Sequence, residues 1–228
     1  MLDAGDSLVG DADPARKTQG QTSVAVMNML GYDAMALGPQ DLALGLTVLQ
    51  QRIAEAKFAV LSANAVVSAT GKLLATPFVI REFGGHKAAI VGLSGGGGTA
   101  EIAVRDPLKT AQTAVTQAAS QADAVILLSH AGETVDRQIA DTVPGITLIV
   151  SSGPFALVMP WRSEKTGASI VHADEATSGH AGRRIGIAAL TVEPSGKMGQ
   201  LNWQRVDLGP EIADDPAMIE WLQRQLGQ

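Results

Sequence analysis

The sequence contains no cysteine, which excludes disulfide bonds and thiolate chemistry. Any metal site must therefore use histidine, carboxylate or amide ligands. The chain also lacks a block of lysine and arginine residues, and its formal net charge is −6. Because binding to nucleic acid needs clustered positive charge, we expect no nucleic-acid partner. No apolar run reaches the roughly 18 residues that a membrane-spanning helix requires, so we expect no membrane partner.

Residues 1–6 (Met-Leu-Asp-Ala-Gly-Asp) lack the positive charge and the apolar core of a signal peptide. We therefore expect no signal peptide in this sequence. The absence of cysteine fits both the cytosol and the periplasm, so the compartment stays open.

A chain of 228 residues, 46% of them hydrophobic, can bury one large core, and we expect a single soluble domain over residues 1–228. Short apolar runs alternate with helical patterns, which indicates an α/β fold. Helices are predicted at residues 23–30, 42–56, 108–122, 134–140 and 216–226. Strands are predicted at 34–37, 58–63, 124–128, 146–150, 169–172 and 185–192, with a hairpin of 78–83 and 87–93.

Four stretches in a fixed order resemble the motifs of a known family. They are Leu-Asp-Ala-Gly-Asp-Ser-Leu-Val-Gly at 2–10, Leu-Gly-Tyr-Asp-Ala-Met-Ala-Leu-Gly at 30–38, Leu-Leu-Ser-His-Ala-Gly at 127–132 and Pro-Gly-Ile-Thr-Leu-Ile-Val at 144–150. Over nearly its whole length the chain resembles the N-terminal metallophosphatase domain of the 5′-nucleotidases, in the calcineurin-like metallophosphoesterase superfamily. This resemblance implies a four-layer α/β/β/α sandwich.

The chemistry of that family needs two adjacent divalent cations, which bind the phosphate oxygens and lower the pKa of a bound water. About seven oxygen and nitrogen ligands at strand ends hold the two ions. By the resemblance, Asp6 matches the metal-bridging aspartate, and His130 matches the single histidine ligand of the second metal. Asp136 and Ala140 continue the pattern of the histidine motif.

The other functional positions of the family are replaced in this chain. Pro39 stands at the asparagine ligand, Gln40 at the catalytic histidine, and Gly153 and Phe155 at the two histidines of the Gly-His-x-His motif. Glutamine can donate a hydrogen bond but cannot transfer a proton near neutral pH. The family's first motif, Asp-x-His-Gly, should lie before Asp6, so we expect a fold that lacks the first strand. We also expect no C-terminal nucleotide-binding domain.

These replacements favour a degenerate, non-hydrolytic domain that serves in binding or interaction. One divalent ion (Mn, Zn or Fe), held weakly by Asp6 and His130, is the only cofactor that we consider. The rival hypothesis is an active phosphoesterase that hydrolyses a small phosphate ester such as a nucleotide, with Glu133, Asp41 or His180 as substitute ligands. A third possibility is a fragment of a longer protein. The family's members are often periplasmic or secreted, but the resemblance leaves the compartment of this chain open.

Each candidate residue also has a structural interpretation. Asp6 is either a residual ligand or a carboxylate that caps a turn, and His130 is either a ligand or a hydrogen-bonded structural residue. Gln40 either contacts a bound polar ligand or is a turn residue, and Asp41 supports the site or caps a helix. The glycine run at 94–98 favours a mobile loop over an anion cradle, because no Lys-Ser/Thr pair follows it.

Three further expectations concern the remaining histidines, the tryptophans and the first strand. His172 and His180 lie near the cleft edge in the family's layout, but a surface ion cluster with Asp174, Glu175 and Arg183 is at least as good an interpretation. The scattered Trp161, Trp203 and Trp221 favour core or surface-covering roles over base stacking. The missing first strand leaves residues 2–5 with an unpaired neighbour, for which a homodimer is our preferred solution.

Overall fold

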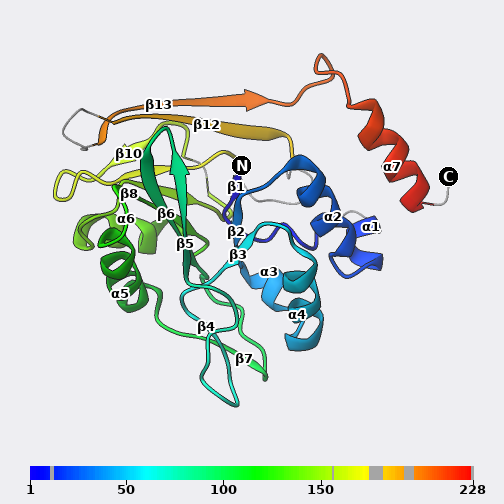
Figure 1. Ribbon diagram of the computed structural model, residues 1–228, viewed down its shortest axis with the longest axis horizontal. Helices are drawn as coiled ribbons and strands as arrows, with labels where there is room; N and C mark the ends of the chain where they lie inside the picture. Colours follow the sequence, from blue (N-terminus) through cyan, green and yellow to red (C-terminus); the bar gives the residue numbers. More distant parts are fainter. Residues whose placement is uncertain (11–12, 156, 175–181, 193–197, 227–228) are drawn as a thin grey trace.

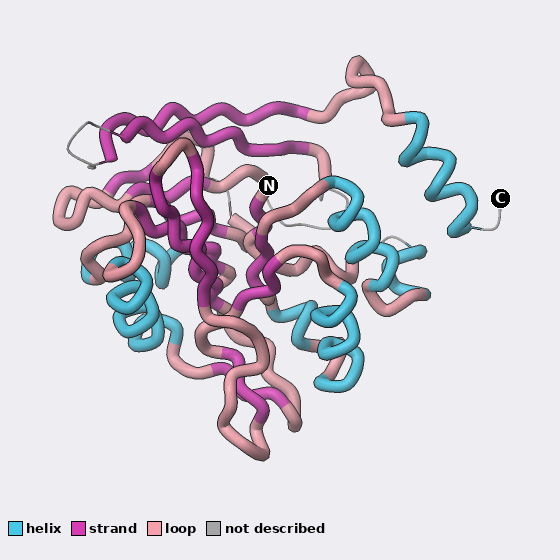
Figure 2. The backbone as a smooth tube through the Cα atoms, viewed as in Figure 1, coloured by secondary structure: helices cyan, strands magenta, loops and turns pink. Residues whose placement is uncertain are grey.

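The computed structural model describes residues 1–10, 13–155, 157–174, 182–192 and 198–226. Strands occupy the centre of the molecule and two groups of helices flank them (Figure 2). The helices are α1 Asp13–Lys17, α2 Gln21–Leu30, α3 Pro39–Leu42, α4 Leu46–Glu55, α5 Pro107–Ala119, α6 Glu133–Thr142 and α7 Pro216–Leu226 (Figure 1).

The strands form two larger sheets and two ribbons. A three-stranded parallel sheet has the order β1 (Leu2–Asp3), β2 (Ala34–Ala36), β3 (Ala59–Leu61). A six-stranded mixed sheet has the order β10 (Trp161–Arg162), β11 (Ser169–Val171), β9 (Leu148–Ser151), β8 (Ala124–Ser129), β6 (His86–Leu93), β5 (Phe78–Phe83). The two-stranded ribbons pair β4 (Ala65–Val67) with β7 (Ile102–Val104), and β12 (Arg184–Val192) with β13 (Met198–Asp207).

Three hydrophobic cores separate four layers. The first core lies between α5, α6 and the six-stranded sheet, and the second lies between the three-stranded sheet and α2, α3 and α4. The third lies between the two sheets, where Ala36 and Leu61 meet Ile90 and Leu128. This is the four-layer α/β/β/α sandwich that the sequence predicted.

The hairpin of β5 and β6 forms as predicted. Gly84 and Gly85 connect the strands with positive φ angles of 57° and 85°, which suit the turn that joins two right-twisted strands. The strands β6, β8 and β9 are parallel, so their carboxyl ends meet at one edge of the sheet. That edge carries the candidate site.

The helix predicted over residues 42–56 was wrong in its extent. The chain forms two helices, α3 and α4, because Gly45 takes a positive φ of 80° and begins α4 at Leu46. A glycine at this conformation interrupts the regular helix despite the favourable composition around it.

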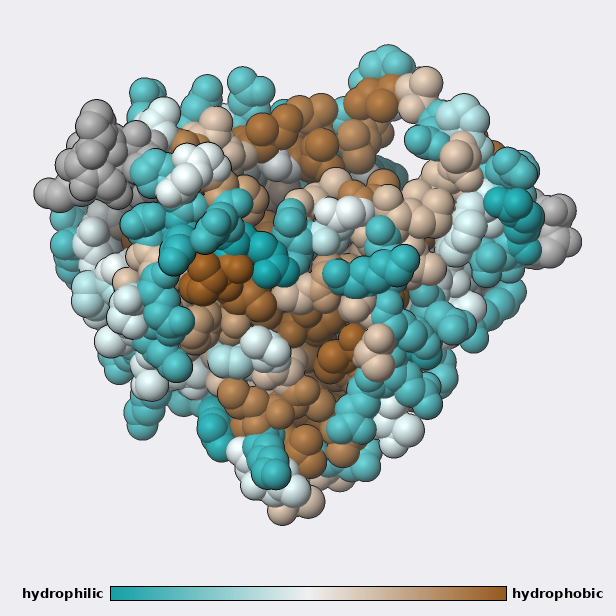
Figure 3. Space-filling model, in the orientation of Figure 1, coloured by the Kyte–Doolittle hydropathy of each residue, from teal (hydrophilic) through white to brown (hydrophobic). Residues whose placement is uncertain are grey.

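The β12–β13 ribbon and α7 contact the rest of the molecule little. Ile185 and Ile187 on β12 are 46% and 48% exposed, and Ile219 on α7 is 39% exposed. In Figure 3 apolar surface lies along the upper edge, where Figure 1 places this ribbon. Among the described helices, none has both the length and the apolar character needed to cross a membrane.

Candidate functional site

The candidate site lies where strands of both sheets end. Asp6 follows β1, Gln40 follows the turn after β2, and His130 comes directly after β8. Loops at the carboxyl ends of parallel strands are where α/β folds place their functional side chains. The structure brings Asp6 and His130 together from opposite sheets.

Asp6 and His130 form a largely buried pair. The His130 Nε2 atom lies 3.1 Å from Asp6 Oδ2, and the two side chains are 8% and 12% exposed, respectively. The His130 Nδ1 atom lies 3.1 Å from the Ala4 carbonyl oxygen, which can only accept a hydrogen bond. Nδ1 therefore carries a proton, and Nε2 faces the carboxylate.

The charge state of His130 follows from this geometry. Burial lowers the pKa of the imidazole, but the hydrogen bond and the charge of Asp6 oppose it, and the pKa is raised above its ordinary value. A carboxylate only accepts hydrogen bonds, so a second proton on Nε2 would let His130 donate to Asp6.

Glycines allow the backbone of the two strand-end loops to approach closely. Gly5 has a φ of 104°, and a Cβ atom there would lie 2.8 Å from the Gly38 nitrogen. A Cβ atom on Gly38 would overlap the Asp6 carboxylate. Asp6 itself has a positive φ of 64°, which aspartate tolerates better than most residues. These contacts explain the glycines of both motifs in physical terms.

Asp41 ties the loops after β1 and β2 together. Its fully buried carboxylate accepts backbone N–H groups of Asp6 at 2.8 Å, Leu8 at 3.0 Å and Gly38 at 2.9 Å. Burial raises the pKa of Asp41 to about 7, although these three donors lower it. Asp41 therefore has both roles expected for it: it supports the Asp6 loop, and it caps α3 by accepting the backbone N–H of Gly38.

Asp136 makes a corresponding tie on the other sheet, and the sequence reading assigned it no role. Its carboxylate accepts the Ser129 hydroxyl at 2.6 Å and the Ser151 hydroxyl. The two serines end the neighbouring strands β8 and β9 and are paired in register. The sequence signal that could have revealed this role of Asp136 is a serine at the end of each of two apolar strands.

The residues at the positions that the resemblance gives as replaced make contacts within the protein. Pro39 opens α3, and the backbone N–H of Gln40 donates to Asp6 Oδ1 at 2.7 Å. Phe155 stacks on His172, with ring centroids 4.3 Å apart. His172 is 2% exposed, so its placement in a surface ion cluster was wrong. The imidazole is buried because the aromatic ring of Phe155 covers it.

The substitute ligands of the rival hypothesis have other partners. Glu133 accepts two hydrogen bonds from Arg137, at 2.8 and 3.0 Å. Asp41 is occupied by three backbone donors. His180, like Glu175, lies outside the described residues. Asp174 forms an ion pair with Arg184 at 3.1 Å.

The donor set of the residues that the structure describes does not fit two metal ions. Within the described ranges, no group of three or more histidine, cysteine or carboxylate residues could hold an ion. Two ions about 3.5–4 Å apart need a larger set of shared ligands. The pair is compatible with one ion. Two donor atoms that each lie about 2.1 Å from the same ion, at right angles to each other, are roughly 3 Å apart, close to the separation of His130 Nε2 and Asp6 Oδ2.

The glycine-rich loop packs on the same region. A Cβ atom on Gly95 would overlap the His130 carbonyl, and one on Gly97 would lie 2.5 Å from the Pro39 Cβ atom. Asn64 anchors the start of this loop, because its side chain exchanges hydrogen bonds with the Ser94 backbone at 2.7 and 2.8 Å. Only residues without a side chain fit so closely against His130 and Pro39.

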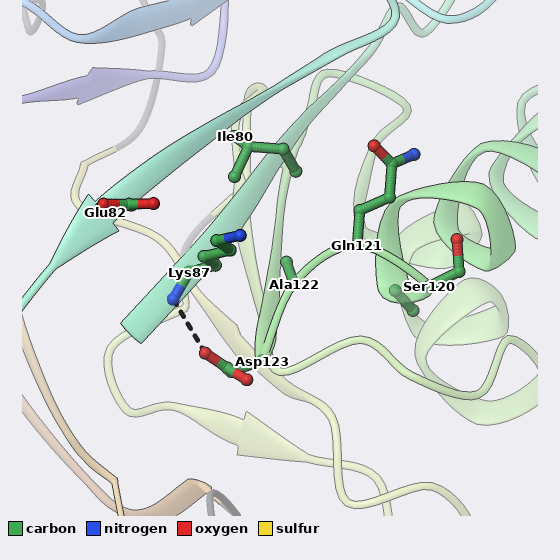
Figure 4. A pocket seen from close by; sticks show the side chains of 8 residues that line it. Ile80, Glu82, Lys87, Ser120, Gln121, Ala122 and Asp123 are labelled. Carbon is green, nitrogen blue, oxygen red and sulfur yellow. Dashed lines mark hydrogen bonds between the residues drawn. The ribbon is translucent and has the colours of Figure 1, made fainter. Parts of the chain in front are cut away.

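A separate surface depression lies at the other end of the strands of the six-stranded sheet, away from the candidate site. Its volume is about 880 Å³, and Ile80, Glu82, Lys87, Gln121 and Asp123 line it (Figure 4). The backbone N–H of Lys87 donates to Asp123 at 2.8 Å. The depression lies at the amino ends of β6 and β8, and none of the candidate residues lines it.

The chain is similar in sequence and structure to phosphoesterases. No family model matches the sequence. The chain is 29% identical over 199 residues to the trifunctional nucleotide phosphoesterase protein YfkN of Bacillus subtilis (69% of this chain, 14% of that protein). It is 31% identical over 161 residues to a probable 5′-nucleotidase of Treponema pallidum (66% of this chain, 27% of that protein). The sulfate thiohydrolase SoxB of Thermus thermophilus superimposes with a TM-score of 0.85 at 26% identity (99% of this chain, 42% of SoxB).

The fold is that of the calcineurin-like metallophosphoesterases. Within this class, the relatives and structural neighbours of the chain are 5′-nucleotidases and calcineurin-like phosphoesterases, which confirms the resemblance noted in the sequence. The chain spans 14% and 27% of the length of the two curated relatives named above.

Proposed function

We propose that the chain is a non-hydrolytic 5′-nucleotidase-like domain that keeps the metallophosphoesterase scaffold for binding or interaction. The scaffold retains one carboxylate and one imidazole, Asp6 and His130, at strand ends. These two side chains would hold a single divalent ion weakly, with water in the other coordination positions. Such an ion would supply a positive charge for an anionic ligand.

One observation carries this proposal: the residues that stand at the remaining ligand positions within this sequence, Pro39, Gly153 and Phe155, have no side-chain donor atom for an ion. Pro39 has no donor atom, and Phe155 packs against His172. The replacements Glu133 and Asp41 are engaged by Arg137 and by backbone N–H groups. Two-ion catalysis would need these groups free and facing one point.

The test is metal analysis of the purified protein together with a phosphatase assay. We expect at most one ion per chain and negligible hydrolysis of an aryl phosphate with added Mn²⁺. Loss of the catalytic groups removes several kcal/mol of transition-state stabilisation, or several powers of ten in rate. Two tightly bound ions, or turnover above about 1 per second that Asp6→Asn abolishes, would instead support the active phosphoesterase.

A further inference from the structure

The His130 loop is held by a buried carboxylate that the proposed function has not yet used. Asp136 lies in the first turns of α6 and is fully buried. One of its oxygens accepts the Ser129 hydroxyl at 2.6 Å, and the other accepts the Ser151 hydroxyl. The carboxylate thus joins one helix to the ends of two strands.

Through the Ser129 hydroxyl, Asp136 restrains the backbone on both sides of His130. Ser129 immediately precedes His130, and its Oγ atom also accepts the backbone N–H of Ala131 at 3.2 Å. The backbone N–H of His130 donates to the Leu93 carbonyl at 2.9 Å. The imidazole Nδ1 is fixed by the Ala4 carbonyl. Backbone and ring are therefore both held, and the Asp136 carboxylate is the group that fixes the Ser129 hydroxyl.

Packing alone does not account for an ionisable group at this position. The neighbours of Asp136 on α6 that face the sheet, Ile139 and Ala140, are apolar and fully buried. An apolar side chain of similar size usually serves a core at least as well as a buried carboxylate does. The hydrogen bonds to both serines instead impose a defined geometry on the two strand ends.

We propose that Asp136 is a positioning residue for His130: through the Ser129 hydroxyl, it holds the imidazole in the orientation that faces Asp6. The role in ion binding rests on the proposed function, whereas the effect on the imidazole does not. Asp41 does the same for the Asp6 loop through backbone N–H groups. A buried carboxylate therefore holds the loop of each residue of the pair: Asp41 holds the Asp6 loop, and Asp136 holds the His130 loop.

The experiment compares Asp136→Asn and Ser129→Ala with the wild type. The chain has four histidines, so the imidazole ¹⁵N signals of His130 can be assigned with a His130→Ala spectrum. We expect both variants to shift the His130 signals in metal-free protein at constant pH. We also expect both to weaken Mn²⁺ or Zn²⁺ binding about tenfold in calorimetry, as loss of a supporting hydrogen bond typically does.

Asp141→Asn is the matched control. Asp141 lies on the same helix and also accepts a serine hydroxyl, that of Ser163 at 2.7 Å, but it does not contact the His130 loop. This variant should leave the His130 signals and the ion affinity unchanged. If Asp136→Asn does not fold, Ser129→Ala tests the same connection without removing the buried carboxylate.

The outcomes separate the two proposals. Unchanged His130 signals in folded Asp136→Asn and Ser129→Ala would overturn the positioning role and leave Asp136 as a structural residue. If wild-type protein binds no ion, the proposed ion site fails, and the shifts of the imidazole signals still decide the role of Asp136.

Discussion

At the residue scale, the hydrogen bond between His130 and the Ala4 carbonyl determines which imidazole nitrogen can bind an ion. It places the proton on Nδ1 and leaves Nε2 facing Asp6 Oδ2 at 3.1 Å. A metal-binding histidine commonly donates its other ring N–H to a carbonyl in this way. Under the proposed function, Nε2 is therefore the ring nitrogen that would bind the ion beside Asp6.

We predict that any divalent ion bound by the chain lies between Asp6 and His130. His130→Ala should remove the calorimetric signal of Mn²⁺ or Zn²⁺ binding, because one carboxylate alone is a poor site. His86→Ala is the control, since His86 lies 3.8 Å from Asp123, near the opposite edge of the sheet. Equal binding by His130→Ala and wild type would place the ion elsewhere.

A second residue-scale prediction concerns the pH dependence of stability. Burial raises the pKa of Asp136 to about 6, while the two serine hydroxyls and the charge of His130 lower it. The folded-state pKa exceeds the unfolded value, so this contribution to stability is complete below about pH 4 and is lost as the pH rises through 6. The loss is about 3 kcal/mol, because the pKa rises from 3.8 to about 6 and each pKa unit corresponds to about 1.4 kcal/mol.

Asp136→Asn cannot titrate, so its free energy of unfolding should fall less than that of wild type between pH 4 and 7. Urea denaturation at several pH values measures this difference. Parallel profiles for the two proteins would contradict a raised pKa at Asp136.

How far the sequence reveals these residues depends on whether their role is local. Asp6 and His130 could be predicted because each follows a strand within a family motif. The burial of His172 could not, because it depends on Phe155, which approaches it only in the folded chain. Asp136 lies between these cases: its motif is visible, but its two serine partners meet only when β8 and β9 pair.

At the element scale, the sandwich depends on close contact between its two sheets at Gly92. A Cβ atom there would lie 2.5 Å from the Leu61 Cβ atom and equally close to the Leu61 carbonyl. The Gly92 carbonyl also accepts the backbone N–H of Ala63 at 2.8 Å. The neighbour is backbone and cannot yield easily, so a side chain at this position must separate β6 from β3.

We predict that Gly92→Ala lowers the free energy of unfolding by about 3 kcal/mol, as overpacking of a core commonly does. Gly10→Ala is the matched control, because no atom of the described residues lies within 4 Å of its added Cβ. The control should stay within about 0.5 kcal/mol of wild type. Urea denaturation of the three proteins measures both effects, and equal stabilities for the two variants would show that the sheets are not in tight contact.

Elements with a strong local signal were predicted, and elements defined by tertiary contacts were not. The Gly84–Gly85 hairpin and the apolar strand β8 were recognisable from turn chemistry and composition. The three-residue strands β4 and β7 are too short to show a period. Strand β13 has a mixed polar sequence, and its structure depends on pairing with β12.

At the scale of the whole molecule, the edge of the three-stranded sheet leads to a prediction about self-association. Among the described strands, β1 pairs only with β2. An open strand edge presents N–H and C=O groups to another chain. Met1 beside it is 55% exposed, and Ile185 and Ile187 on β12 add further exposed apolar surface. A second copy of the chain would cover such surfaces and pair the open edge.

We predict that the chain, with the sequence given, forms a homodimer through the β1 edge at micromolar concentration. Leu2 lies on this edge strand, and its side chain packs partly against the core between the two sheets. Leu2→Lys should convert the dimer to a monomer in light scattering, because a lysine on an edge strand opposes pairing with another chain. Leu73→Lys is the matched control: Leu73 is 39% exposed in the segment that joins β4 to β5, so this variant should stay dimeric. Thermal unfolding of both variants checks that each is folded. A monomeric wild type with a protease-resistant N-terminus would rule out the dimer, since a monomer whose β1 is stably folded has no need of a partner at this edge.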